Sequence, residues 1–375
     1  MATVSLCMIV KNEEEVLARC LDSIQGAVEE IVIVDTGSDD RTKEIASRYT
    51  SRLYDFPWID DFAAARNFAF SKGTQEYLFW LDADDVLTPE SREAFLQLKE
   101  TLDPAVQMVM MKYDVAFDAA GRPTFSYYRE RLMRREAGFL WEGPVHEAIA
   151  PAGRILYSDI AVQHRKLHPG DPARNLRIFE KMKAEGKLRE PRQQYYYARE
   201  LLDNGRYTEA LTGLEAFLDQ GKGWIENNIG ACRDLAACRR ALNDRRGALC
   251  ALLRSLEYGP PRAEVCCDIG GWFFEGGDFR TAIYWYEQAL ARPKEEGAAG
   301  FTLPDCYGYV PLMQLCVCHD RLGEREQAEQ YNEMAGREKP NDPAVRYNRD
   351  YFQKTAGDRV DRENGENRVK GTGRA

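Results

Sequence analysis

EYLFWLDADD, residues 76–85, places three aspartates directly behind an uninterrupted apolar run. Comparable runs are TVSLCMIV at 3–10, EIVIVDTG at 30–37 and QMVMMKYDV at 107–115. Continuous runs of Val, Ile, Leu and Met, rather than alternating ones, are typical of strands that are buried on both faces of a mainly parallel sheet. The first third of the chain is therefore predicted to contain a set of buried strands.

Amphipathic stretches separate these strands. The last of them opens with Thr88 as a plausible helix cap and Pro89 at the first helical position. The predicted helices are 13–25, 40–49, 62–71 and 89–102. Strands that alternate with helices at this spacing predict βαβ units and an α/β domain of the kind that binds nucleotides, over residues 1–170.

Carboxylates stand where the predicted strands end. Asp35 closes one strand, and Asp82 and Asp84 follow another. In open α/β sheets the ligand crevice lies outside the carboxyl ends of the strands. Two acids beside a buried strand repel each other, and a divalent cation held with a nucleotide diphosphate would remove that repulsion. Carboxylate oxygens suit Mg²⁺ or Mn²⁺, so the pattern predicts a metal-assisted nucleotide site.

The second half of the chain, 171–353, shows a helical repeat instead. Alanines recur at intervals of 38, 34 and 46 residues, of which the middle one is an ideal repeat length, and each follows a Gly or Asn by five positions, where a left-handed turn between helices is tolerated. This period is typical of tetratricopeptide repeats. The alanines are Ala210, Ala248, Ala282 and Ala328, and the turn residues are Gly205, Asn243, Gly277 and Gly323. Residues 354–375 have almost no apolar side chains, which favours a disordered tail.

Charge and composition exclude several classes of protein. With 51 Lys and Arg against 61 Asp and Glu, the net charge of −10 argues against nucleic-acid binding. No apolar run is long enough to span a membrane, and no export signal is seen, so we expect a cytoplasmic protein. The ten cysteines form no CxxC pair, which fits a reducing compartment. Zinc at Cys316, Cys318 and His319 is an alternative that lacks a fourth ligand.

Four motifs in this order resemble the family 2 glycosyltransferases of the GT-A fold: SLCMIVKNEE (5–14), IVIVDTGSDDRT (31–42), AAARNFA (63–69) and YLFWLDADD (77–85). The resemblance covers roughly residues 3–165. With the repeats behind it, the chain looks like the tetratricopeptide-bearing branch, whose members include peptide S-glycosyltransferases of glycosylated bacteriocins. This implies a GT-A domain followed by a helical solenoid in a bacterial protein.

The resemblance also assigns roles to residues. Asp35 would receive the nucleobase imide, usually of uracil, Asp82 would contact the ribose, and Asp84 would bind the Mn²⁺ or Mg²⁺ that bridges the diphosphate. A histidine after the last strand often completes the metal site, so His164 is the expected second ligand, with His168 as the alternative. The residues expected to bind the donor nucleotide are Lys11, Asn12, Glu13, Asp35, Arg66, Asn67 and Asp82.

A further segment, GFLWEGPVHEAI at 138–149, resembles the glycine turn and acidic pair that carry the catalytic base in GT-A enzymes. Glu147 is the first choice for this base and Glu142 the second. Gly143 would allow the backbone to approach the sugar. His146 replaces the more usual acid, and it could orient Glu147, touch the donor or cap a helix.

The sequence thus predicts a metal-dependent, inverting glycosyltransferase that uses a UDP-sugar and a peptide, protein or saccharide acceptor. A nucleotidyltransferase would need a glycine- and Arg/Lys-rich loop after the first strand, which is missing, and an inactive scaffold would need none of the acids. Aromatic runs such as Tyr195–Tyr197 and 272–274 cannot all face inward on one helix, so we expect some to form a contact surface for the acceptor or for a second protomer in a homodimer.

Overall fold

The computed structural model describes residues 1–118, 121–168, 170–293 and 303–354. They form two compact units, one of residues 1–244 and the other of residues 245–293 and 303–354. The predicted disordered tail lies outside the described residues, apart from Lys354.

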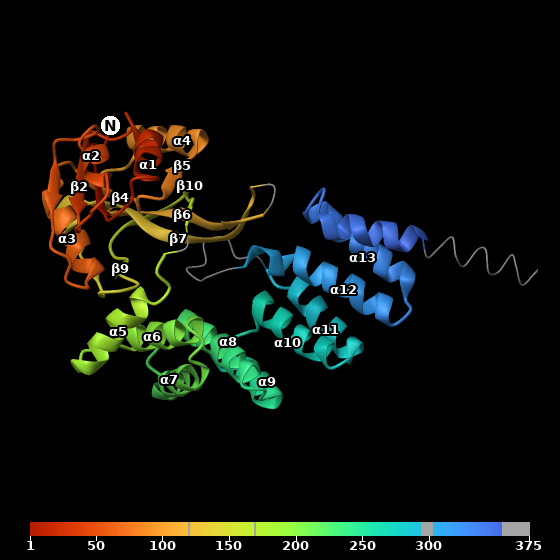
Figure 1. Ribbon diagram of the computed structural model, residues 1–375. Helices are drawn as coiled ribbons and strands as arrows, with labels where there is room; N and C mark the ends of the chain where they lie inside the picture. Colours follow the sequence, from red (N-terminus) through yellow and green to blue (C-terminus); the bar gives the residue numbers. More distant parts are fainter. Residues whose placement is uncertain (119–120, 169, 294–302, 355–375) are drawn as a thin grey trace, which may run out of the picture. The chain divides into compact units, whose positions relative to one another are not determined.

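The first unit contains one large mixed sheet, with strands in the order β3-β2-β1-β4-β7-β6-β10-β5 (Figure 1). Strands β3, β2, β1 and β4 are parallel to one another, and β6 is parallel to β10. Strand β7 lies antiparallel between β4 and β6, and β5 is antiparallel to β10. The strands are β1 Val4–Val10, β2 Glu30–Asp35, β3 Leu53–Asp55, β4 Tyr77–Trp80, β5 Asp85–Leu87, β6 Met108–Phe117, β7 Pro123–Arg134 and β10 Ile155–His164. A small separate ribbon joins β8 Trp141–Glu142 to β9 Ala148–Ile149.

Helices cover both faces of this sheet, which explains why its strands are continuously apolar. Leu6 and Met8 of β1 pack on the side of α1 and α4, and Cys7 packs on the side of α3. Thr88 caps α4 as predicted, because its hydroxyl accepts from the Ser91 amide at 3.2 Å. The helices are α1 Leu17–Ile24, α2 Thr42–Ala46, α3 Phe62–Lys72 and α4 Pro89–Thr101.

The register of the strands brings the predicted acids to one edge. Val10 at the end of β1 pairs with Asp35 at the end of β2. After β4 the chain makes a tight turn, in which the Asp85 amide donates to the Asp82 carbonyl at 3.0 Å. Asp85 then pairs with His164 at the end of β10. Residues 79 positions apart in sequence therefore meet at the carboxyl edge of the sheet.

The rest of the described chain is helical, and the predicted repeat is confirmed by its turns and its core. Gly205, Asn243, Gly277 and Gly323 all have positive φ, between 62° and 78°. Ala210, Ala248, Ala282 and Ala328, which follow these turns, are fully buried. The helices are α5 Arg174–Ala184, α6 Pro191–Asp203, α7 Tyr207–Gln220 and α8 Ile225–Ala241 in the first unit, and α9 Arg245–Arg254, α10 Ala263–Glu275, α11 Phe279–Leu290, α12 Tyr309–Arg321 and α13 Arg325–Glu338 in the second.

One prediction about the repeats is wrong. Tyr195, Tyr196 and Tyr197 are all buried, although they are consecutive on α6. The reason is that α6 is covered on several sides. Tyr195 packs against Phe217 of α7, and Tyr197 packs against α5. Tyr196 stacks on a side chain of the α/β domain, which no repeat pattern could indicate.

Two absences hold for the described residues. None of their helices is long and apolar enough to cross a membrane. The suggested zinc ligands Cys316, Cys318 and His319 do not form a group that could hold an ion; His319 instead contacts Glu324 at 2.7 Å and stacks on Tyr331.

Candidate functional site

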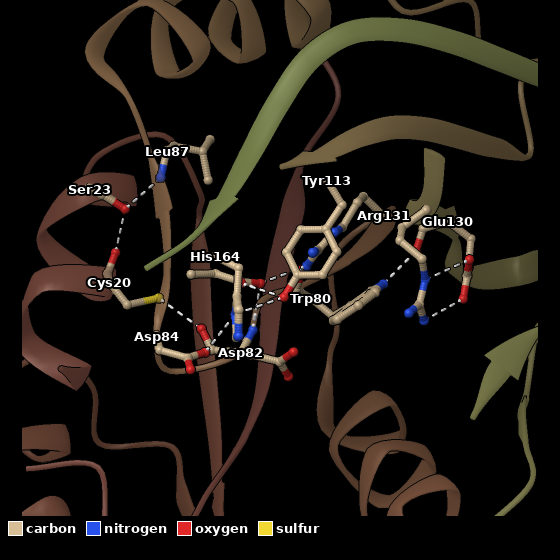
Figure 2. A network of polar contacts seen from close by, with 12 residues as sticks. Cys20, Ser23, Trp80, Asp82, Asp84, Leu87, Tyr113, Glu130, Arg131 and His164 are labelled. Carbon is tan, nitrogen blue, oxygen red and sulfur yellow. Dashed lines mark hydrogen bonds and ion pairs between the residues drawn. The ribbon is translucent and has the colours of Figure 1, made fainter. Parts of the chain in front are cut away.

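Asp84, Asp85 and His164 meet at the carboxyl edge of the sheet. His164 Nδ1 lies 3.2 Å from an Asp84 carboxylate oxygen and 3.4 Å from Asp85 Oδ1 (Figure 2). Within the part of the chain that the structure describes, these three side chains are the one group of His, Cys, Asp and Glu arranged closely enough to hold a metal ion. Burial alone would lower the pKa of His164, but hydrogen bonds and charge from Asp84 and Asp85 raise it to about 10.

Asp85 has a supporting position in this group. Its carboxylate accepts from Arg131 Nη1 at 3.0 Å, from the Tyr113 hydroxyl at 2.9 Å and from the Asp82 amide at 3.0 Å. The side chains of Asp85 and Arg131 are fully buried, whereas that of Asp84 is 18% exposed. Asp84 and His164 are thus the members that could hold a divalent cation, because carboxylate oxygen and imidazole nitrogen both suit Mn²⁺-class ions.

Asp85→Ala should reduce the free energy of unfolding by about 3 kcal/mol, because it leaves Arg131 buried without its counter-charge. Denaturant unfolding monitored by tryptophan fluorescence measures this. Asp84→Ala is the matched control and should change stability by less than about 1 kcal/mol. Equal losses in both variants would contradict the division of roles between these two aspartates.

Asp35 lies in a second part of the site, at the end of β2. Its side chain is 1% exposed, and its Oδ1 atom accepts from the amides of Gly37 and Ser38 at 2.9 Å each. Its Oδ2 atom is buried and has no hydrogen-bond partner among the described residues. A buried carboxylate oxygen without a partner is costly, so this atom is available to accept from a ligand.

The residues after β1 border Asp35. Asn12 has a φ of 55°, and its amide and side chain bond the loop of Ser38 and Asp39 at 2.9 Å each. The Glu13 amide donates to Thr42 Oγ1 at 2.7 Å. Burial, together with the negative charges of Asp84 and Asp82, raises the pKa of Glu13 to about 7. Glu13 thus belongs to the acidic edge, while Lys11 is exposed.

Arg66 connects Asp82 to the loop at 143–147. On α3, its Nη2 atom donates to Asp82 at 2.7 Å and its Nε atom donates to Glu147 Oε1 at 2.6 Å. The guanidinium also lies over the rings of Trp80 and Trp141, 4.7 and 4.9 Å from their centroids. Burial would raise the pKa of Asp82, but the charge of Arg66 lowers it to about 2. Asp82 is therefore ionised, and one guanidinium contacts both Asp82 and Glu147.

Asn67, the next residue on α3, contacts the backbone of β8. Its Oδ1 atom accepts from the Trp141 amide at 2.9 Å, and its Nδ2 atom donates to the Trp141 carbonyl at 3.0 Å. Both polar groups of Asn67 therefore hold β8 in place. Gly143 follows with a φ of 92°, a backbone conformation that residues with a side chain rarely adopt. Glu142, the alternative base, is exposed on β8.

The adjacent residues His146 and Glu147 contact different partners. Glu147 contacts Arg66, whereas His146 Nε2 lies 2.8 Å from Glu200 of α6. His146 thus contacts the helical region and does not cap a helix of the α/β domain. His168 is exposed and contacts Glu15 at 2.7 Å, so the structure places His164, and not His168, beside Asp84.

Comparisons with known proteins show which families this chain resembles. Residues 5–157 match the family Glycosyl transferase family 2. The chain is 38% identical over 330 residues to a TPR repeat-containing protein of Synechococcus elongatus, covering 88% of this chain and 64% of that protein. It is 30% identical over 159 residues to the lipopolysaccharide core biosynthesis glycosyltransferase LpsC of Rhizobium meliloti, covering 40% of this chain and 58% of LpsC. It is 24% identical over 241 residues to the SPbeta prophage-derived glycosyltransferase SunS of Bacillus subtilis, covering 59% of this chain and 54% of SunS.

The chain spans between 54% and 64% of the lengths of these relatives. The family match covers the segments that carry Asp35, Arg66, Asp82, Asp84 and Glu147. Residues 5–157 of the α/β domain therefore match glycosyl transferase family 2, and a helical region of the tetratricopeptide type follows them.

Proposed function

We propose that the chain is a metal-dependent, inverting glycosyltransferase that transfers a sugar from a UDP-sugar to a peptide, protein or saccharide acceptor. The observation that carries the proposal is the bridge made by Arg66. One guanidinium joins Asp82, beside the metal-binding group, to Glu147, the candidate base. Arg66 would thus hold the acid proposed to contact the donor, Asp82, close to the acid proposed to act on the acceptor, Glu147.

The nucleotide would bind along the carboxyl edge. The buried, unpartnered Oδ2 atom of Asp35 is suited to accept a hydrogen bond from the N–H of a uracil imide. Lys11, Asn12 and Glu13 border that position, and Asp82 would accept from the ribose. Asp84 and His164 would hold Mn²⁺ or Mg²⁺, and the bound ion would supply positive charge to the diphosphate leaving group.

Transfer then depends on this chain's own side chains. Glu147 would accept the proton of the acceptor as the acceptor atom bonds to C1 of the sugar. The bond from C1 to the diphosphate oxygen breaks on the opposite face, which inverts the anomeric configuration. Arg66 engages Oε1 of Glu147, and Oε2 has no hydrogen bond among the described residues, so it is free to receive the proton. A positioned base of this kind contributes about 10²–10⁴-fold to the rate.

A thermal-shift panel of UDP-, GDP- and dTDP-sugars, with and without Mn²⁺, tests the proposal. A ligand at about 100 times its Kd stabilises the folded state by about 2.7 kcal/mol, so UDP-sugars with Mn²⁺ should raise Tm by several degrees. The other nucleotides and the metal-free samples should give smaller shifts. If no sugar nucleotide shifts Tm, the proposed donor is wrong.

The acceptor is proposed more broadly. The name of LpsC places that relative in lipopolysaccharide core biosynthesis, which supports a saccharide acceptor, while repeat surfaces commonly bind peptides. Tyr284 and Trp224 are exposed aromatic residues of the helical region, at 55% and 45% exposure. A homodimer through the repeats stays a prediction, which light scattering at several protein concentrations tests.

A further inference from the structure

The loop that carries Glu147 is held by helices of the repeat region. We propose that Glu200, on α6, is a positioning residue for sugar transfer: through His146 it fixes the loop that presents Glu147 to the acceptor. The inference rests on the proposed role of Glu147 as the proton acceptor. Glu200 itself touches neither the donor-side acids nor Arg66, so its action would pass through the loop.

The contacts at His146 are of several kinds. Its Nε2 atom lies 2.8 Å from Glu200 Oε1, and Asn175 of α5 donates to the same oxygen at 3.1 Å. The imidazole stacks on Tyr196 with ring centroids 4.3 Å apart and an angle of 19°. Arg192 of α6 donates to the His146 carbonyl at 3.1 Å. Helix α6 thus holds both the side chain and the backbone of this one loop residue, and α5 in turn holds the Glu200 carboxylate.

The backbone of His146 shows that the loop needs this support. Its φ is 52°, in the left-handed region that residues other than glycine rarely adopt. Such conformations persist where surrounding contacts enforce them. Since His146 contacts α6 while Glu147 contacts Arg66, a residue that fixes His146 also fixes the position of the next carboxylate.

A second junction supports the same conclusion. Lys181 of α5 contacts Asp60 at 2.6 Å, and Arg174 of α5 lies over the ring of Phe62 at 4.8 Å. The Phe62 amide donates to the carbonyl of Pro144 at 2.9 Å. The start of α3, which carries Arg66, and the loop that carries Glu147 are therefore bonded to each other and to α5.

Glu200 is suited to this role by its ionisation state. Its side chain is mostly buried, and burial alone would raise its pKa. Hydrogen bonds from His146 and Asn175 outweigh this effect and lower the pKa, so Glu200 stays a carboxylate that accepts from both. Replacing it by Gln keeps an oxygen acceptor at this position, whereas Ala removes the acceptor.

The test compares Glu200→Ala and Glu200→Gln in the full chain. First, hydrogen–deuterium exchange without ligand is measured on peptides covering residues 143–149. Glu200→Ala should speed exchange there by about 10-fold or more, while β1 and β4 remain protected. Second, UDP binding with Mn²⁺ should be unchanged, but UDP-sugar turnover should fall by about 10–100-fold, the cost of a small misplacement of a catalytic group. Glu200→Gln should retain most of both properties.

Glu215→Ala is the matched control. It breaks an ion pair between α7 and Arg239 of α8 that touches no part of the α/β site, so exchange at 143–149 and turnover should both be unchanged. The inference is overturned if loop exchange in Glu200→Ala is unaltered. It is also overturned if loop exchange becomes faster while turnover stays normal, or if UDP binding falls together with turnover. Failure of the wild-type chain to bind or turn over a UDP-sugar would instead contradict the proposed function. The loop exchange is measured without substrate, so the two failures are distinguishable.

Discussion

Asp84→Ala should abolish Mn²⁺-dependent binding of UDP while the protein stays folded. Asp84 is the partly exposed carboxylate of the candidate metal-binding group, and its side chain contacts His164. Without it, one imidazole would remain as a direct ligand, since Asp85 is occupied by Arg131 and Tyr113. Removing a negative charge from an acidic edge also relieves repulsion, so stability should not fall. Isothermal titration calorimetry of UDP with and without Mn²⁺ gives the affinity.

Asp159→Ala provides a matched control for this measurement. Asp159 lies on β10, the strand that ends in His164, and its side chain is 89% exposed in an ion pair with Lys112. Loss of this surface pair should leave UDP affinity in the presence of Mn²⁺ unchanged. An Asp84→Ala protein that binds UDP and Mn²⁺ with wild-type affinity would exclude Asp84 as the metal ligand, and Asp85 would then have to be reconsidered.

The sequence could predict the acidic edge because its signals are local. The apolar run before Asp82 marks a buried strand, and parallel strands end at the same edge of a sheet. That rule alone is enough to bring Asp35 and Asp84 to one edge. The pairing of β5 with β10 then places His164 beside Asp84, as the resemblance to family 2 implied.

The strand β7 could not be read in the same way. Its sequence, PTFSYYRERLMR, contains Arg129, Glu130 and Arg131, and charged residues normally indicate exposure. Arg131 is nevertheless fully buried, because Asp85 neutralises it and its guanidinium lies 3.8 Å from the ring centroid of Trp80. The charge becomes tolerable only once a residue 46 positions away is in place. The two tyrosines that precede these charged residues favour a strand, and they are the sequence feature from which β7 could have been predicted.

The site contacts that the sequence did not reveal are long-range ones. Arg66 and Glu147 are separated by 81 positions, and His146 and Glu200 by 54. The sequence periodicity of α6 does not indicate that Tyr196 stacks on His146, which lies in a loop of the α/β domain. A repeat pattern describes how helices pack on each other, so an additional partner on one helix appears only in the folded structure.

Glu147→Gln should preserve UDP-sugar binding and slow transfer by about 10²–10⁴-fold, the usual cost of losing a general base. Glutamine has nearly the same volume, and its amide oxygen can still accept from Arg66 Nε, which contacts Glu147 Oε1 at 2.6 Å. The bridge to Asp82 should therefore persist, but the amide cannot take a proton at neutral pH. Calorimetry with UDP and Mn²⁺, together with turnover of the UDP-sugar, separates binding from chemistry.

Glu142→Gln is the control for this prediction, because Glu142 lies in the same segment but is exposed on β8. It should bind donor and turn over at the wild-type rate. If Glu147→Gln turns over normally and Glu142→Gln does not, the base is Glu142, and the ion pair with Arg66 would then serve only to anchor the loop. If both variants lose donor binding, the segment 141–149 contributes to the donor pocket itself. The bridge through Arg66 favours Glu147, since it joins that carboxylate to the acid expected to contact the donor ribose.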